Sequence, residues 1–255
     1  MELNINKKEI INALKNVEMK GKWAGTSGLS TKALGNYVNF KLHNNRLLII
    51  NADESTTAIK SITVETEDEG FFTLEISTIR KYLDKMGDEI KLTVDDTVVI
   101  QSNGKRATLP IVIRHPHQER INNFIEHYPF ERENNIPKIG SVNLSCGVEM
   151  SAVAFQEAIT ACEIVNNGIY RLDYVETDDI SDAKFLISSN MQVASYREDL
   201  GIINSHGESA TVIFSGPIHK FFNKDETITI YLGDNEPILI LSEGGAILRA
   251  PRAGI

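Results

Sequence analysis

Apolar residues recur with a helical period in two stretches of the chain and alternate with polar residues in several others. Residues 8–17 place Ile10, Leu14 and Val17 three or four positions apart, and residues 150–165 repeat this spacing. Such a period buries one face of an α-helix. Residues 90–94 (IKLTV) and 228–232 (ITIYL) alternate instead, which predicts half-buried antiparallel β-strands.

One order of predicted elements occurs twice. Beginning at Thr73 and again at Thr211, a short apolar strand is followed by a short helix and then by a meander of three strands. Turn residues interrupt the two meanders at matching places, at Asn103-Gly104 and at Gly244-Gly245, and such pairs are typical of β-hairpins. The offset of 138 residues between Thr73 and Thr211 is too long for a solenoid repeat. We infer that one domain is duplicated.

The repeat predicts two similar α+β domains, residues 1–115 and 138–255. Each is expected to run through a strand, a helix, several strands, a short helix and three further strands. Residues 116–137 lie between them and are rich in His, Asn, Glu and Arg, with scattered apolar side chains. This composition predicts an interdomain connector.

Composition and charge exclude several classes of protein. The 255 residues include 26 Lys and Arg against 35 Asp and Glu, a net charge of −9. A protein that wraps nucleic acid with its whole surface would be basic, so any nucleic-acid contact here must use a local basic face. Two cysteines are too few for a disulfide framework. With no signal peptide and no long apolar run, we expect a soluble intracellular protein.

The most specific motifs lie near the C-terminus. Residues 229–237 (TIYLGDNEP) and 248–252 (LRAPR) resemble the last hairpin and the terminal Leu-Ala-Pro-Lys/Arg signature of the proliferating cell nuclear antigen (PCNA) family of DNA polymerase sliding clamps. Ile136-Pro137 resembles the Ile-Pro of that family just before its second domain. The resemblance is to clamps of archaeal or viral type, and it covers most of the chain. Residues 20–36 carry no recognisable part of it.

This resemblance implies two DNA-clamp domains, with antiparallel sheets outside and helices lining a ring. It implies a homotrimer that encircles duplex DNA without sequence preference, is closed by a clamp loader, and tethers DNA polymerase and other replication and repair enzymes. Such a processivity factor is not an enzyme and needs no cofactor or metal. A subunit of a heterotrimeric or checkpoint-like ring is an alternative. The implied location is cytoplasmic and nucleoid-associated, in an archaeon or a virus-infected cell.

Basic residues on the predicted helices are the candidates to face DNA, because binding without sequence reading needs positive charge toward phosphates. Lys8 and Lys15 lie on the face of the first helix opposite its apolar side chains. The DNA-facing set that the resemblance implies is Lys8, Lys15, Arg80, Lys81, Lys85, Lys220 and Lys224. The third helix, over residues 150–165, contains no Lys or Arg, so we predict no DNA contact from it.

The resemblance also implies two protein-binding surfaces. A partner-peptide pocket beneath the connector would be formed by Ile136, Pro237, Leu248, Ala250 and Pro251. Neighbouring subunits would pair an edge strand of domain one, expected over residues 107–114, with an edge strand of domain two, expected over residues 190–197. The corresponding interface residues are Ala107, Leu109, Ile111, Ile113, Gln192, Ala194 and Tyr196.

A metal-dependent hydrolase is the alternative from a different class. His115 and His117, followed by His127, form the one constellation that could bind a metal. Pro116 separates the first two, and no carboxylate or cysteine stands at a fixed spacing to complete a site. The sequence also lacks a phosphate-binding GxxxxGK[ST] loop, a GxGxxG turn and a GxSxG nucleophile turn. This scarcity favours a scaffold over an enzyme.

Overall fold

The computed structural model describes residues 1–19, 37–166, 168–177, 183–216 and 218–252. Residues 20–36, which the family resemblance leaves unassigned, lie outside this part. The chain forms two compact units and passes from the first to the second between Ile121 and Asn122. This point lies within the predicted connector, while the domain limits at residues 115 and 138 stay a prediction.

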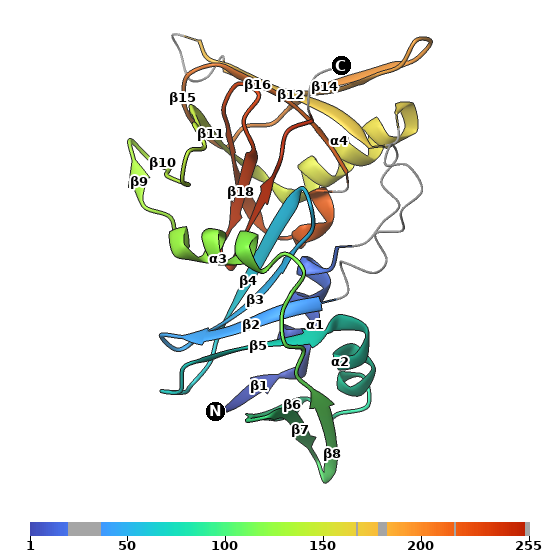
Figure 1. Ribbon diagram of the computed structural model, residues 1–255. Helices are drawn as coiled ribbons and strands as arrows, with labels where there is room; N and C mark the ends of the chain where they lie inside the picture. The colour runs from blue at the N-terminus through green and yellow to red at the C-terminus, as the bar shows by residue number, and fades with distance from the viewer. Residues whose placement is uncertain (20–36, 167, 178–182, 217, 253–255) are drawn as a thin grey trace. The chain divides into compact units, whose positions relative to one another are not determined.

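Unit 1 contains two antiparallel sheets, each with a helix packed against it (Figure 1). One sheet has the order β1-β6-β7-β8 and the other has the order β4-β3-β2-β5. Along the chain the elements are β1 (Glu2–Asn6), α1 (Lys7–Val17), β2 (Tyr37–His43), β3 (Arg46–Ala52), β4 (Thr56–Thr63), β5 (Gly70–Glu75), α2 (Ile76–Leu83), β6 (Glu89–Val94), β7 (Thr97–Ser102) and β8 (Lys105–Pro110).

Local sequence explains where α1 begins and which face it buries. The Asn6 side chain caps the helix by accepting a hydrogen bond from the Lys8 amide at 2.9 Å, as expected for an amide residue at this position. Ile10, Leu14 and Val17 are at most 1% exposed, and α1 packs against β3 and β4. The period in residues 8–17 therefore predicted this helix correctly, and its polar stripe is left exposed.

Unit 2 repeats this plan with additions. Its sheets have the orders β14-β13-β12-β16 and β15-β11-β17-β18-β19, and β9 and β10 form a small hairpin. The elements are α3 (Gln118–His127), whose first turn belongs to unit 1, then β9 (Arg132–Glu133), β10 (Ile136–Pro137), β11 (Cys146–Ser151), α4 (Ala152–Val165), β12 (Ile169–Val175), β13 (Lys184–Asn190), β14 (Ser195–Leu200), β15 (Asn204–Gly207), β16 (Ala210–Ser215), the 3-10 helix η2 (Ile218–Phe221), β17 (Thr227–Leu232), β18 (Ile238–Ser242) and β19 (Gly245–Arg249).

Three expected elements differ from the structure. The connector contains a helix, α3, because Ile121, Phe124 and Ile125 fall on one buried side of residues 118–127. The fourth predicted helix is only a short 3-10 turn, so Lys220 lies on η2 while Lys224 lies beyond it. The third predicted helix begins two residues late, after the extended residue Ser151.

The first turn of α3 is fixed to unit 1 by polar side chains. The Gln118 amide oxygen accepts a hydrogen bond from Asn39 on β2 at 3.0 Å. Arg120 donates through Nε to the Thr57 hydroxyl oxygen on β4 at 3.0 Å and through Nη1 to the Glu54 carbonyl. These bonds hold the start of the connector in one place on the sheet of unit 1. Among the described helices, none is long and apolar enough to cross a membrane.

Candidate DNA, partner and subunit interfaces

Exposed lysines gather on the two helices of unit 1. Lys8 and Lys15 lie on the exposed stripe of α1, and Lys81 and Lys85 lie one turn apart on and just after α2. The helices α1 and α2 contact each other in unit 1 (Figure 1). Within the described part of the chain these four lysines form no ion pair. Their charges are therefore available to an external anion such as a phosphate.

Arg80 differs from these lysines. Its Nη1 lies 2.5 Å from Glu18 Oε2, at the end of α1, and both side chains are largely buried, at 28% and 19% exposed. A charge-assisted bond of this kind holds the guanidinium in place and neutralises it. Sequence spacing put Arg80 in the DNA-facing set, but the contact with Glu18 depends on tertiary packing that spacing does not reveal.

Unit 2 offers fewer cations on the corresponding elements. Helix α4 has no basic residue, Glu157 is exposed on it, and Glu163 accepts a hydrogen bond from the Tyr170 hydroxyl at 3.1 Å. Lys220 and Lys224 are exposed and form no ion pair with another described residue. The described cations of the predicted set are thus concentrated on α1 and α2.

A row of residues crosses one face of the β15-β11-β17-β18-β19 sheet. Strand pairing places Gly147 opposite Tyr231, Tyr231 opposite Leu239, and Leu239 opposite Leu248. Directly paired residues in antiparallel strands share a face. Tyr231 and Leu239 are buried, whereas Leu248 at the end of the row is half-buried. The row forms an apolar strip that ends at a partly accessible leucine.

The connector hairpin lies close to this strip. The Asn134-Asn135 turn, with φ of 50° and 67°, joins β9 to β10. The charge of Arg132 on β9 acts on Tyr231, whose pKa is nevertheless raised because burial is the larger effect. Ile136 is half-buried on β10. The β9 strand of the hairpin therefore lies within electrostatic range of Tyr231, and the β10 strand paired with it carries Ile136.

All five residues of the predicted partner pocket are half-buried residues of unit 2: Ile136, Pro237, Leu248, Ala250 and Pro251. Two residues of the strip were not predicted: Leu239, which is paired with Leu248, and Tyr231, which is paired with Leu239. The alternation of residues 228–232 predicted the strand. Only the pairing register, which joins residues far apart in sequence, places Tyr231 in the strip that ends at Leu248.

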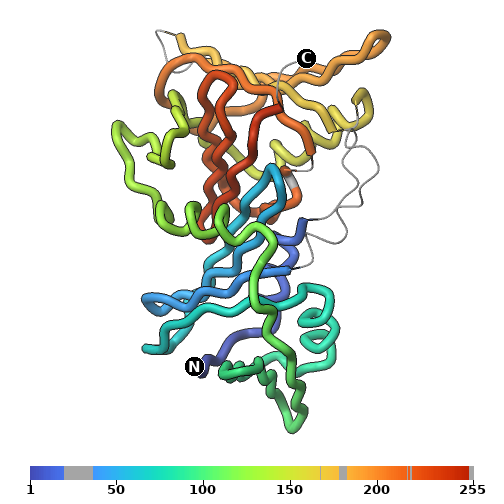
Figure 2. Tube along the Cα trace, in the orientation of Figure 1, coloured from blue at the N-terminus to red at the C-terminus, as the bar shows by residue number. Residues whose placement is uncertain are grey.

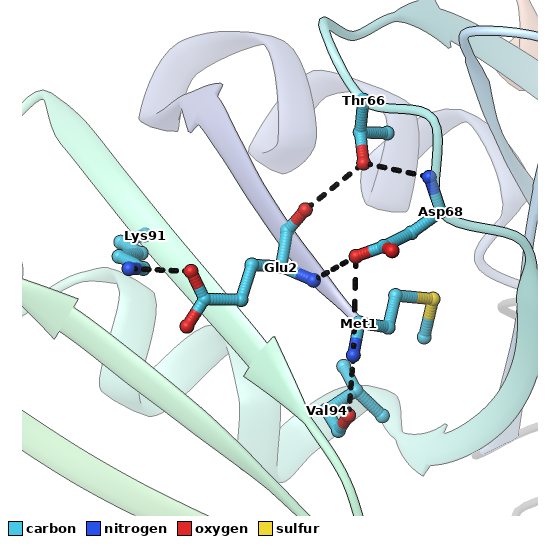
Figure 3. Close-up of polar contacts among 6 residues, drawn as sticks. All are labelled: Met1, Glu2, Thr66, Asp68, Lys91 and Val94. Atoms are coloured by element: carbon cyan, nitrogen blue, oxygen red, sulfur yellow. Dashed lines mark hydrogen bonds and ion pairs between the residues drawn. The ribbon is translucent and has the colours of Figure 1, made fainter.

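Several outer strands are covered along their free side. On β1, the Glu2 amide donates to Asp68 Oδ2 at 2.6 Å, and the Thr66 hydroxyl donates to the Glu2 carbonyl at 3.1 Å (Figure 3). On β5, the Thr73 carbonyl accepts from the Val112 amide at 2.9 Å. These contacts block further strand pairing at β1 and β5.

The outer strand β16 is covered in the same way. The Ile213 carbonyl accepts from the Arg252 amide at 2.7 Å, and the Thr211 carbonyl accepts from the Asn235 amide at 3.1 Å. By contrast, no other described residue forms a backbone hydrogen bond with the outer side of β8 or β14. These two strands are the open edges that the predicted subunit contact requires.

Both expected edge strands have different limits in the structure. Strand β8 ends at Pro110, so Ile111 and Ile113 lie beyond it, and Ile113 is fully exposed. The single strand expected over residues 190–197 is wrong: residues 191–194 form the turn between β13 and β14, which contains Gln192 and Ala194. This hairpin projects from its unit (Figure 2). Of the domain-two candidates, only Tyr196 lies in the edge strand.

The histidines of the metal alternative do not converge on a site. His115 is buried, with Nε2 3.2 Å from both the Tyr37 carbonyl and Asn51 Oδ1, while Nδ1 accepts from the His117 amide at 3.0 Å. His127 makes separate bonds at the end of α3. Burial lowers the pKa of His115 to about 4. The described residues contain no group of three His, Cys, Asp or Glu side chains suited to a metal ion.

No protein-family model matches the sequence, and no curated protein matches it either. Solved structures, however, share its fold over the whole chain. PCNA of A. fulgidus, in a structure with the C-terminal region of FEN-1 bound to it, has a TM-score of 0.70 and 16% identity and covers 100% of this chain and 99% of its own. PCNA of Thermococcus kodakaraensis has a TM-score of 0.69 and 13% identity, with coverages of 98% and 99%.

The β subunit of DNA polymerase III from Thermotoga maritima has a TM-score of 0.73 and 14% identity. It covers 100% of this chain, which spans only 66% of the β subunit. The fold of this chain is therefore that of the sliding clamps. Within that class it is PCNA-like, since it matches the PCNA chains over nearly their full length. The predicted resemblance to PCNA-type sliding clamps and the predicted fold class are confirmed, whereas the archaeal or viral type stays a prediction.

Proposed function

We propose that this protein is a DNA sliding clamp, a processivity factor that encircles duplex DNA as a homotrimeric ring and tethers polymerase and other enzymes to it. One observation carries the proposal. The chain has the two-unit PCNA-like fold over nearly the full length of the PCNA chains that it matches. In support, exposed lysines that form no ion pair with another described residue gather on helices of the kind expected to line the ring.

Electrostatics supports a sliding contact. Lys8, Lys15, Lys81 and Lys85 would face the phosphates of the duplex, and contacts with phosphates position a protein on DNA without reading its sequence. A few screened contacts give weak binding that depends on salt, so the ring would move along the duplex rather than dwell at one site. The net charge of −9 would discourage binding of DNA to the rest of the surface.

Partner binding follows from the apolar strip of unit 2. A short peptide with an aliphatic and an aromatic anchor would place them beside Leu248 and Ile136, under the connector hairpin. Buried anchors of this type supply most of the affinity of peptide interfaces. The proposed partners are replication and repair enzymes, a clamp loader and duplex DNA, in the cytoplasm of an archaeon or a virus-infected cell.

A topological experiment tests the central proposal without a clamp loader. The purified chain is incubated at high concentration with a linear duplex biotinylated at both ends, so that rings thread on, and streptavidin is then added to block the ends. We expect protein to remain on the blocked duplex through gel filtration at high salt and to leave the unblocked duplex. Equal loss from both would contradict encirclement.

Charge reversal identifies the DNA-facing surface in the same assay. Lys81→Glu combined with Lys85→Glu should reduce threading and lower the salt dependence of binding by about two units, one for each phosphate that the variant no longer neutralises. Lys60→Glu, a lysine on β4 rather than on a helix, is the matched control. An unchanged salt dependence in the double variant would show that these lysines do not face the duplex.

A further inference from the structure

We infer that two copies of this chain join β8 of one to β14 of the next in a single register, in which Lys105 lies opposite Leu200 and Pro110 lies opposite Ser195. This inference rests on the proposed ring. It adds the residue pairing and a charge contact, Arg106 with Asp199, that would fix the pairing. The occupant of the open β8 edge is thus a second copy of the chain.

The hairpin before β8 determines which of its backbone groups point outward. Asn103 and Gly104 form a two-residue turn with φ of 48° and 75°, so the flanking residues Ser102 and Lys105 form a hydrogen-bonded pair. Alternation then directs the backbone groups of Arg106, Thr108 and Pro110 to the open edge. Pro110 has no N–H, and it lies where a missing donor costs no bond to β7.

The same alternation orients β14. The Met191 amide donates to the Ala194 carbonyl at 2.8 Å, which starts the ladder between β13 and β14. Along β14, every second residue after Ala194 bonds toward β13. These residues are Tyr196, Glu198 and Leu200. The backbone groups of Ser195, Arg197 and Asp199 therefore point to the open edge. Each edge thus presents three outward residues to the other.

Side-chain faces exclude a slip by one residue. On β8, Ala107 and Leu109 are buried while the outward set is exposed, and on β14 the residues of the outward set are likewise exposed. A slip by one would place the buried face of β8 level with the exposed face of β14. The six residues of β8 and the six of β14 overlap completely when Lys105 pairs with Leu200.

Charge distinguishes this register from a slip by two. In the full-overlap register Arg106 is directly opposite Asp199, and both side chains are exposed and form no ion pair with another described residue. A slip by two in one direction would set Arg106 opposite Arg197, which is unfavourable, since like charges at paired positions repel. A slip in the other direction leaves Arg106 beyond the end of β14.

Apolar residues support the contact on its helical side. The full-overlap register pairs Leu109 with Tyr196. Helix α2 packs beside β8 and carries Tyr82, which is 42% exposed, and α4 packs beside β14 and carries Ile164, which is 86% exposed. Large exposed apolar side chains next to open edges are typical of surfaces that another chain covers.

A charge swap tests the pairing on the full chain. Arg106→Asp or Asp199→Arg alone should raise the concentration at half assembly about tenfold, because an attraction becomes a repulsion at each contact. The two changes together should restore it to within about threefold of the original value. Glu208→Arg, an exposed acid after β15, is the matched control. Assembly is measured by sedimentation velocity at several protein concentrations and salt concentrations.

Disulfide trapping reads the register directly. Thr108→Cys with Arg197→Cys places two thiols at directly paired positions, whose Cβ separation of about 5.5 Å is nearer to what a disulfide needs than that of the diagonal pairs. Thr108→Cys with Ser195→Cys is two residues out of register and should link poorly. Burial raises the pKa values of the native Cys146 and Cys162 thiols to about 12 and about 11, so the introduced thiols are the reactive ones.

The outcomes test the proposed register and the proposed ring separately. Rings that form normally but link through Thr108→Cys with Ser195→Cys, or that show no rescue by the charge swap, would overturn the register and leave the proposed function intact. A native chain that stays monomeric at all concentrations would overturn the proposed homotrimer itself. Linked multimers from the Thr108→Cys and Arg197→Cys pair, together with rescue, support the inference.

Discussion

The Arg80 guanidinium and the Glu18 carboxylate bridge α2 to the end of α1, with Nη1 and Oε2 2.5 Å apart. The pair places a neutralised cation among the exposed lysines of unit 1. Because Glu18 holds it, Arg80 should contribute less to DNA binding than its neighbour Lys81, which is exposed and forms no ion pair with another described residue. The acid at the end of α1 therefore moderates the positive charge of this surface.

Releasing Arg80 should strengthen the contact with DNA. Glu18→Gln removes the carboxylate, and we expect the salt dependence of binding to rise by about one unit, because one more cation can displace a counterion from the duplex. Anisotropy of a labelled duplex of about 30 bp at low ionic strength measures this. Glu9→Gln removes an exposed acid of α1 and is the control for net charge. Equal effects of the two changes would mean that the Arg80 contact is irrelevant to DNA.

Buried His115 should make the protein sensitive to acid. The pKa of His115 is lowered to about 4 by burial, against an ordinary value of 6.5. Below pH 6.5 the unfolded chain takes up a proton at His115 that the folded chain does not, so the free energy of unfolding falls as the pH falls. The loss continues to about pH 4 and amounts to at most about 3 kcal/mol.

Urea unfolding at pH 7, 6, 5 and 4.5 measures this effect. His115→Asn should be less stable than the native chain at pH 7, because the bonds to Tyr37 and Asn51 are altered. Its stability should also fall less steeply between pH 6.5 and 4.5, and the difference in slope isolates the titration of His115 from that of the carboxylates. Parallel pH profiles for the two proteins would refute the assignment.

The sequence predicted correctly the hairpins and helices that depend only on residues close together in the chain. The alternation in residues 90–94 and 228–232 and the Asn103-Gly104 turn predicted the meanders of both units. The sequence did not predict the β13–β14 turn, because residues 191–194 (MQVA) contain neither Gly nor Pro. Helix α3 was missed because its buried residues, Ile121, Phe124 and Ile125, are too few to stand out among polar neighbours.

The candidate sites were only partly predictable for a different reason. Spacing on a helix identifies an exposed lysine such as Lys15, because the apolar face of the helix is buried and the opposite face is therefore exposed. It cannot show that Arg80 is held by Glu18, or that Tyr231 and Leu248 belong to one strip through Leu239, because these relationships depend on tertiary packing and pairing register. Long-range register and ion pairing are fixed by packing of the whole unit, which one sequence does not reveal.

Gly207 should be essential for the stability of unit 2. It pairs with Cys146 and has φ of +95°, and a Cβ there would lie 2.1 Å from the Ser145 carbonyl oxygen. Gly207→Ala therefore combines a backbone clash with a conformation that L-residues rarely adopt, and we expect a loss of more than about 2 kcal/mol.

Gly201→Ala is the matched control, since a Cβ at Gly201 meets nothing within 4 Å. It should change the free energy of unfolding by less than about 0.5 kcal/mol, as surface substitutions usually do. Thermal and urea unfolding of both variants give the comparison. Similar stabilities for the two would mean that the β11–β15 pairing tolerates the added methyl group.

Leu248→Arg should weaken partner binding strongly without disturbing the ring. Leu248 is the half-buried end of the strip formed with Leu239 and Tyr231, and a peptide anchor seated there would have to desolvate the new charge, which costs several kcal/mol. Peptides with a Gln-x-x-aliphatic-x-x-aromatic-aromatic motif should bind the native chain at micromolar levels. We expect the variant to bind at least about 30-fold more weakly, the equivalent of about 2 kcal/mol for one buried anchor.

Val175→Arg provides the control for adding a charge at a partly exposed apolar residue. Val175 is 41% exposed on β12, in a different sheet of the same unit, so its replacement should leave peptide affinity unchanged. Isothermal titration gives the affinities, and sedimentation confirms that each variant assembles like the native chain, since a disrupted ring would make weaker binding uninformative. Native affinity in a correctly assembled Leu248→Arg ring would place the partner site away from the strip. In that case the connector hairpin beside Tyr231 would have to serve some purpose other than covering a bound peptide.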